Sequence, residues 1–255
     1  MEYISSNQNQ KVKLWKSLST VKGRKTTGTY LIEGWHLVNE AIKAEASFQA
    51  IIGSEEQIEN HLADVPHGVP AFVVSEEVVR HISETDSSQS IFAQVSLPNN
   101  SFDPTYVHNG RWLLLDKIQD PGNLGTLIRT ADSAGFDGVA ISNKSSDLFN
   151  PKVIRSTQGS IFHLKVINNI DLKDWINAFS ANGLNIYGTT VDNKAISYKE
   201  IGFQDNFGLI LGNEANGVSS ELLEKTTINI YIPINGKAES LNVAVAGGIL
   251  MYALN

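Results

Sequence analysis

The first candidate for chemistry is a polar loop, residues 116–125, which follows a short apolar segment and is itself followed by Arg129. Arginine carries a planar set of N–H donors that suits phosphates and developing anionic oxygens, and it does not readily lose its proton. Pro121 and Gly122 predict a turn in the loop, and Asn123 is predicted to cap the helix that follows. A capped helix that carries a surface arginine is the plain structural alternative for this loop.

Two later loops also follow apolar segments and carry polar side chains. In the second loop, residues 212–217, two glycines flank Glu214, whose carboxylate can accept hydrogen bonds from a ligand or hold an arginine. In the third loop, residues 233–243, Ser240 is predicted to cap the last helix and Asn242 to lie in its first turn. An amide in that position needs hydrogen-bond partners if it is buried. A plain turn and a capping serine are the structural alternatives for these two loops.

From residue 111 onward the hydrophobic pattern alternates between strands and helices. Apolar runs predict strands at residues 112–115, 139–141, 163–167, 185–189, 207–211 and 228–232. Helical patterns cover residues 124–134, 151–158, 172–182 and 241–254, and the last of these is apolar on every side. This order predicts a largely parallel sheet covered by helices on both faces. Because ligands of such sheets bind beyond the carboxyl ends of the strands, chemistry is expected in the loops that follow them.

The front part of the chain, residues 3–95, is predicted to form a separate small α/β unit. Its predicted helices are residues 12–18 and 33–46, its predicted strands are residues 30–32, 50–52 and 71–74, and residues 91–95 form another apolar run. The stretch between Leu97 and Gly110 is rich in proline, asparagine, serine and aspartate, and it predicts a linker. We therefore expect two domains, residues 1–97 and residues 107–255.

The net charge of −7 argues at first against a nucleic-acid partner, but the charge is unevenly distributed. The first 25 residues contain six basic side chains and one acidic side chain. Such a segment can attract phosphates to an otherwise acidic body, and the candidate contacts are Lys11, Lys13, Arg24 and Lys25. Each phosphate contact is expected to steepen the salt dependence of binding by roughly 0.7–0.9 in log–log slope. The alternative is a solvated, lysine-rich helix face.

Taken together, the three loops resemble the three sequence motifs of the SpoU (TrmH-like) family of the SPOUT superfamily. The matching strings are Asp120-Pro121-Gly122-Asn123-Leu124-Gly125 with Arg129-Thr130-Ala131, then Leu211-Gly212-Asn213-Glu214-Ala215-Asn216-Gly217, then Ile232-Pro233 with Gly236 and Ser240-Leu241-Asn242-Val243-Ala244. The front part resembles the small substrate-binding domain that often precedes the catalytic domain, through Ile4-Ser5-Ser6, Asn9, Lys11-Val12-Lys13, Arg24, Gly28 and Ile32-Glu33-Gly34. The catalytic resemblance covers residues 111–255.

The resemblance implies an RNA methyltransferase that moves a methyl group from S-adenosylmethionine to a ribose 2′-hydroxyl. It implies a trefoil knot near the C-terminus that binds this cofactor, and a homodimer whose active site draws on both chains. Ribosomal RNA is the preferred substrate because the front domain resembles those of ribosomal RNA modifiers, and transfer RNA stays open. A family member that binds RNA without methylating it also stays open.

The resemblance also assigns roles to individual residues. It places Asn123, Arg129, Glu214, Ser240 and Asn242 at the catalytic centre, and it places the cofactor against Thr189, Thr190, Leu211, Gly212, Ile232, Ser240 and Leu241. Arg129 is regarded in the family as the base, but a guanidinium is a poor base, so we expect it to position phosphate and the developing alkoxide, with Glu214 orienting it. Ala244 departs from the family, in which many members have a serine two residues after the asparagine.

Several other classes are disfavoured. The absence of cysteine excludes a disulfide scaffold and a thiolate metal site, and the expected chemistry requires no metal. A dinucleotide-dependent oxidoreductase would need a G-x-G-x-x-G fingerprint, which is absent. The polar start lacks the apolar core of a secretory signal, and the longest apolar stretch, residues 241–254, is shorter than the roughly 20 residues of a membrane span. We therefore expect a cytoplasmic protein.

Overall fold

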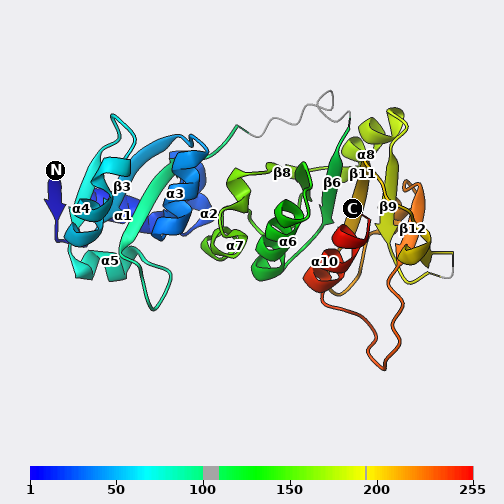
Figure 1. Ribbon diagram of the computed structural model, residues 1–255. Helices are drawn as coiled ribbons and strands as arrows, with labels where there is room; N and C mark the ends of the chain where they lie inside the picture. Colours follow the sequence, from blue (N-terminus) through cyan, green and yellow to red (C-terminus); the bar gives the residue numbers. More distant parts are fainter. Residues whose placement is uncertain (100–108, 193, 255) are drawn as a thin grey trace. The chain divides into compact units, whose positions relative to one another are not determined.

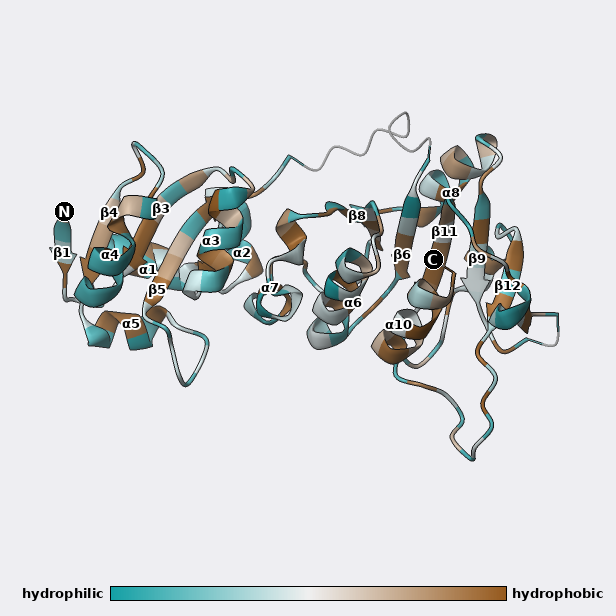
Figure 2. Ribbon diagram, viewed as in Figure 1, coloured by the Kyte–Doolittle hydropathy of each residue, from teal (hydrophilic) through white to brown (hydrophobic). Residues whose placement is uncertain are grey.

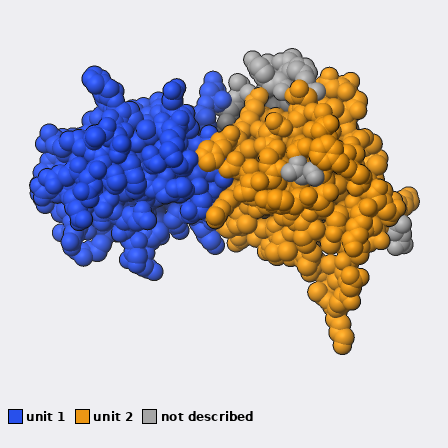
Figure 3. All heavy atoms as spheres, in the orientation of Figure 1, with its two compact units in different colours: residues 1–99, 149–162 blue, residues 100–148, 163–255 orange. Residues whose placement is uncertain are grey.

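The computed structural model describes residues 1–99, 109–192 and 194–254, and it divides into two compact units (Figures 1 and 3). The first unit contains residues 1–99 and 149–162, and the second contains residues 100–148 and 163–255. Most of the predicted linker and the predicted start of the second domain at residue 107 lie outside the described residues.

The first unit is a five-stranded sheet with short helices. Its elements are β1 (Glu2–Ile4), α1 (Gln10–Ser17), α2 (Val21–Thr27), β2 (Thr29–Glu33), α3 (Trp35–Lys43), β3 (Phe48–Gly53), α4 (Glu55–His61), β4 (Ala71–Val74), α5 (Glu76–Ile82) and β5 (Ile91–Ser96). The strand order is β1-β4-β3-β5-β2, and β5 runs antiparallel to both of its neighbours. The core of this sheet includes Val12, Trp15, Ile52, Val78 and Phe92, all of which are buried. The three predicted strands and the two predicted helices are confirmed to within three residues, and the apolar run at residues 91–95 forms β5.

Three helices of this unit, α2, α4 and α5, were not predicted, and each is only seven residues long. Helices this short show too little of the 3.6-residue pattern to be recognised by periodicity. Their start signals were nevertheless present. Ser54 and Ser75 accept hydrogen bonds from backbone amides in the first turns of α4 and α5, and each serine is followed by two glutamates.

A segment distant in sequence completes the first unit. Helix α7 (Pro151–Thr157) and its flanking residues belong to this unit, although they follow the second strand of the other sheet. The ring of Phe149 packs against Tyr30 at a centroid distance of 4.7 Å. His36 is hydrogen-bonded through Nε2 to the carbonyl oxygen of Gln158 at 3.0 Å. The chain therefore leaves the second unit after residue 148 and re-enters it at residue 163.

The second unit contains the predicted parallel sheet. Its elements are β6 (Arg111–Asp116), α6 (Pro121–Ser133), β7 (Gly138–Ser142), β8 (Lys165–Ile170), α8 (Leu172–Ala181), β9 (Asn185–Thr189), β10 (Ile196–Ser197), β11 (Phe207–Gly212), α9 (Ser220–Leu223), β12 (Ile228–Tyr231) and α10 (Val243–Ala253). The strand order is β10-β12-β9-β11-β6-β7-β8, and every pair is parallel. The mixed α/β class with a mostly parallel second sheet is confirmed, and the knot itself stays a prediction.

The central strands of this sheet are rich in apolar residues (Figure 2), and successive side chains of a strand point to opposite faces of the sheet. Ile210 joins a buried cluster with Trp112 and Trp175 of α8. Leu211, the next residue, faces α10, because a Cβ added at Gly247 would lie 2.7 Å from Leu211 Cδ1.

Among the described residues, no helix combines the length and the apolar character needed to cross a membrane.

Trp175 gives a test of this packing. It is fully buried, and its indole Nε1 has no hydrogen-bond partner among the described residues. Trp175→Ala should lower the free energy of unfolding of the second unit by about 3–5 kcal/mol, because it leaves a large cavity. Trp175→Phe keeps most of the ring contacts and removes an unpaired buried donor, so it should cost less than about 1.5 kcal/mol. Urea unfolding measures both values, and equal losses would contradict this account.

Candidate active site

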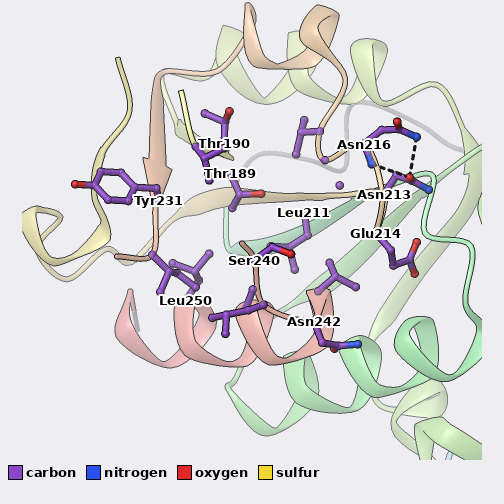
Figure 4. A pocket seen from close by; sticks show the side chains of 18 of the residues that line it. Thr189, Thr190, Leu211, Asn213, Glu214, Asn216, Tyr231, Ser240, Asn242 and Leu250 are labelled. Atoms are coloured by element: carbon purple, nitrogen blue, oxygen red, sulfur yellow. Dashed lines mark hydrogen bonds between the residues drawn. The ribbon is translucent and has the colours of Figure 1, made fainter. Parts of the chain in front are cut away.

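A cavity of about 550 Å³ lies beyond the carboxyl ends of β9, β11 and β12 (Figure 4). Its wall is completed by the second loop, by the loop after β12 and by one face of α10. All seven residues predicted to hold the cofactor line it, namely Thr189, Thr190, Leu211, Gly212, Ile232, Ser240 and Leu241. The wall also contains apolar residues that the sequence did not single out, including Val218, Tyr231, Ala246 and Leu250.

Gly212 ends strand β11 at the point where the second loop folds back on it. A Cβ at this position would lie 2.0 Å from the amide nitrogen of Val218 and 2.1 Å from the carbonyl carbon of Gly217. Both atoms are backbone, so no side chain fits without moving the loop. The loop is closed by a hydrogen bond from the Gly217 amide to the Asn213 carbonyl at 2.8 Å. The glycine is therefore required by the tight return of the chain beside the cavity.

Glu214 connects the second loop to the first loop. Its carboxylate accepts hydrogen bonds from the backbone amides of Gln119 and Asp120, each at 3.2 Å, and from Asn123 Nδ2 at 3.0 Å. The pKa of Glu214 lies below its ordinary value of 4.5. Desolvation by burial raises this pKa, but the hydrogen bonds from the Asn123 side chain and from backbone amides outweigh it and favour the charged form.

Asn123 and Asn242 extend this connection to the third loop. Asn242 Nδ2 donates to Asn123 Oδ1 at 3.0 Å. Asn242 Oδ1 accepts from the backbone amides of Ala244 at 2.9 Å and Val245 at 3.3 Å, and so caps α10. Glu214, Asn123 and Asn242 thus form one chain of hydrogen bonds through all three loops, which we call the three-loop chain.

The structure corrects two predicted helix caps. The N-cap of α6 is Asp120, whose Oδ1 accepts from the amide of Asn123 at 2.8 Å, and Pro121 opens the helix. Proline favours the first helical position, so the acidic residue before it becomes the cap. The N-cap of α10 is Asn242, and α10 begins at Val243 rather than at Leu241. Ser240 therefore lies in the loop, on the wall of the cavity, and does not cap the helix.

Arg129 lies apart from the other predicted catalytic residues. It is exposed on α6 and is not among the described residues that line the cavity. The hydrogen-bond donors to the Glu214 carboxylate are its own backbone amide and groups of the first loop, so the expected orienting contact between Glu214 and Arg129 is not made within the described residues of one chain. One chain therefore brings together Asn123, Glu214 and Asn242, with Ser240 on the cavity wall, and leaves Arg129 outside.

The sequence did not reveal the importance of Asn213. Its Nδ2 donates to the Lys117 carbonyl at 3.0 Å, and its Oδ1 accepts from the amides of Ala215 and Asn216 and from the Asn216 side chain, each at 3.1 Å. An asparagine side chain that accepts from the backbone amide two residues later forms an Asx turn, and an asparagine in a loop is the sequence signal for it.

Among the described residues, no group of three or more acidic or histidine side chains is placed to hold a metal ion.

The four basic side chains predicted to contact phosphates in the first unit differ in exposure and in their partners. Lys13 and Lys25 are exposed, and Lys11 pairs with Glu2 at 2.5 Å. Arg24 is only 3% exposed, and its Nη1 donates to the Leu18 carbonyl at 2.7 Å. This corrects the expectation for Arg24, because its guanidinium joins α2 to the end of α1 instead of facing solvent.

Family models match both units of the chain. The model of the SpoU rRNA Methylase family matches residues 110–252, and the model of the MRM3-like substrate binding domain matches residues 9–93. The chain therefore belongs to the SpoU rRNA methylase family.

Individual proteins are similar over the whole chain. The Bacillus subtilis 23S rRNA (guanosine(2553)-2′-O)-methyltransferase RlmP is 44% identical over 254 residues, which cover 100% of this chain and 99% of the relative. The crystal structure of the AdoMet-bound rRNA methyltransferase from Sinorhizobium meliloti is 29% identical and aligns with a TM-score of 0.90 over 99% of this chain and 97% of that chain. A putative RNA methyltransferase of the TrmH family from Porphyromonas gingivalis is 30% identical, with a TM-score of 0.87 over 98% of each chain.

The lowered pKa of Glu214 predicts a pH-dependent stability. Because the folded-state pKa lies below the unfolded value, the stabilisation is fully present above the ordinary value of 4.5 and is lost as the pH falls through the folded value. The difference in unfolding free energy between the wild type and Glu214→Gln should therefore be largest near pH 7 and should shrink as the pH falls below the ordinary value of 4.5 and through the folded value. Urea unfolding at stepped pH measures it, with Glu224→Gln, an exposed glutamate, as the control. A difference that stays constant with pH would contradict the prediction.

Proposed function

We propose that the chain is an RNA methyltransferase that transfers a methyl group from S-adenosylmethionine to a ribose 2′-hydroxyl of 23S ribosomal RNA. The observation that carries the proposal is a cavity lined by the second and third loops, with every predicted cofactor residue on its wall and the first loop joined to it through the three-loop chain. The 44% identity to an enzyme named for 2′-O-methylation of 23S rRNA supports the reaction and the substrate class. The likeness to an AdoMet-bound rRNA methyltransferase supports the cofactor.

The cavity fits the proposed cofactor in size and chemistry. Its volume of about 550 Å³ lies within the range of roughly 300–1,000 Å³ that small-molecule sites occupy. Leu211, Ile232, Leu241 and Leu250 give it apolar walls suited to a stacked base and a methionine side chain, and Thr189, Thr190 and Ser240 add polar groups. When bound, S-adenosylmethionine supplies a methyl group already activated by the sulfonium.

The protein's own residues then have to align the ribose hydroxyl and help to remove its proton. The three-loop chain joins the N-terminal ends of α6 and α10 to each other and to the second loop. Ser240 and Asn242 shape the wall that the ribose must approach. Arg129 stabilises the developing alkoxide or the adjacent phosphate, because a guanidinium keeps its charge and does not act as a base.

A methylation assay tests the proposed function. Purified protein with labelled S-adenosylmethionine should label an unmodified 23S rRNA transcript, and mapping should place the methyl group on a ribose 2′-oxygen. Preferential labelling of unmodified transfer RNA would replace the substrate. Binding of rRNA and cofactor without any transfer would identify the chain as a non-catalytic RNA-binding member. Absence of heat in calorimetry with millimolar S-adenosylmethionine would overturn the cofactor assignment.

We also propose that the active form is a homodimer. Three apolar side chains of α10, at helical spacing, face solvent in the isolated chain, with Val245 53%, Ile249 36% and Tyr252 58% exposed. An apolar stripe of this kind is typical of a surface that a second chain covers. Sedimentation at micromolar concentration should give twice the chain mass of 27.9 kDa. A species at the chain mass itself would refute the dimer.

Arg129 is expected to act on the reacting ribose and to contribute little to cofactor binding. Arg129→Ala should lower the methylation rate about 100-fold or more, which is the scale for loss of one preorganised donor. The dissociation constant for S-adenosylmethionine should change by less than about threefold. Arg129→Lys keeps the charge but loses the planar fork, so it should recover little activity. An alanine variant with normal turnover would remove Arg129 from the mechanism.

The position of Arg129 outside its own chain's cavity predicts that it serves the site of the partner subunit. Neither Arg129→Ala nor Glu214→Ala should be active as a homodimer. Co-expressed mixed dimers should regain activity, because one of their two sites then contains an intact Arg129 from one chain and an intact Glu214 from the other. Mixed dimers as inactive as the parents would show that both residues act within one chain.

A further inference from the structure

Two lysines beside the active site hold a backbone conformation that side chains rarely adopt. Lys117, directly after β6, has φ of 58°, and Lys144, two residues after β7, has φ of 71°. In this left-handed region a Cβ crowds the following carbonyl, and glycine is the residue that enters it without strain. Strained residues of this kind persist only where the surrounding structure holds them, and they cluster at functional sites.

The backbone of Lys117 is held from both sides. Its amide donates to Ser142 Oγ at 2.8 Å, and its carbonyl accepts from Asn213 Nδ2 at 3.0 Å. The side chain of Gln119 then joins the two lysines, because Gln119 Nε2 donates both to the Lys117 carbonyl, at 3.5 Å, and to the Lys144 carbonyl. One amide therefore keeps the two left-handed residues close together.

The same residue attaches this pair to the active site. The backbone amide of Gln119 donates to Glu214 Oε2 at 3.2 Å, so the lysines and the three-loop chain share a support. The strands β11, β6 and β7 are neighbours in the parallel sheet, so their carboxyl ends lie at one edge. Lys117 and Lys144 therefore lie at the same edge of the sheet as the cavity, on the side of the first loop.

Both side chains are available to a ligand. Lys144 is exposed, and it forms no ion pair among the described residues. The Lys117 side chain is 43% exposed, and its Nζ lies 3.9 Å from Asp116 Oδ1. Asp116 is buried, and its Oδ2 accepts from the amide of Ser219 at 2.9 Å, so the contact with Lys117 is a long one.

We propose that Lys117 and Lys144 form a pair of phosphate contacts that bind the RNA backbone next to the methylated nucleotide. The proposal rests on the proposed function, because it takes RNA as the substrate. Glycine would satisfy the backbone at both positions without strain. Unlike glycine, a lysine at each position supplies a positive charge at a fixed place near the site. A pair of such charges suits the phosphates of a nucleic-acid backbone.

The double variant Lys117→Gly/Lys144→Gly separates charge from backbone, because it relieves both left-handed residues and removes both charges. Its melting temperature should equal or exceed that of the wild type, and its affinity for S-adenosylmethionine should be unchanged. Its affinity for an unmodified 23S rRNA transcript should fall about tenfold or more at low salt, and the log–log salt slope should fall by roughly 1.4 to 1.8, the sum of two phosphate contacts.

Two control variants are matched to the two changes. Asn169→Gly relieves another left-handed residue of the same unit, with φ of 56°, and leaves the charge as it is. Lys225→Ala removes a lysine that precedes β12 and so lies at the amino edge of the same sheet. Both controls should keep the wild-type RNA affinity and salt slope.

The outcomes distinguish this proposal from the proposed function. A double variant with wild-type RNA affinity and salt slope overturns the phosphate contacts, even if the wild type methylates RNA. A loss of affinity as large in Lys225→Ala also overturns them, because it shows a diffuse effect of net charge. If the wild type binds the transcript without methylating it, the proposed reaction fails, and a reduced salt slope in the double variant still supports the contacts.

Discussion

The arrangement of the site depends on one carboxylate that can only accept hydrogen bonds. Because ionised Glu214 has no proton to donate, Asn123 must turn its NH₂ group toward it, which leaves Asn123 Oδ1 facing Asn242. Asn242 must then present its own NH₂ group to Asn123, and its remaining oxygen caps α10. The charge on one side chain therefore sets the orientation of two amides and the start of a helix that is distant in sequence.

The same carboxylate also fixes the shape of the first loop. Glu214 accepts hydrogen bonds from the backbone amides of Gln119 and Asp120, which lie just before α6. Asp120 is also the N-cap of α6. The loop is thus held by its own capping residue on one side and by the second loop on the other. Polar groups that share partners in this way stabilise one arrangement together more than their separate bonds would suggest.

The sequence predicted the parts of the structure that repeat a regular pattern or match a motif. Six of the seven strands of the second unit followed from short apolar runs, whereas the two-residue strand β10 did not. The walls of the cavity followed from the motif positions that end the predicted strands. Asp120 and Asn242 were not identified as caps, because several side chains in each loop have the right chemistry and only the backbone decides among them. The sequence did not predict the burial of Arg24, because a charged side chain in a basic segment is expected to be exposed to solvent. The contacts of Gln119 with Lys117, Lys144 and Glu214 form because β6, β7 and β11 are neighbours in the sheet. The order of residues along the sequence does not show which strands are neighbours.

Residues 149–162 belong to the first unit, and this limits how the chain can be divided into fragments that fold. Cutting the chain near residue 100 would not yield an independent catalytic piece, because Val153 and Ile154, which are 0% and 1% exposed, are buried in the unit that would be removed. The remaining piece would carry an apolar helix without its cover, and the removed piece would lack one wall of its core. The two units are interleaved along the sequence, so this chain is best expressed with both units together.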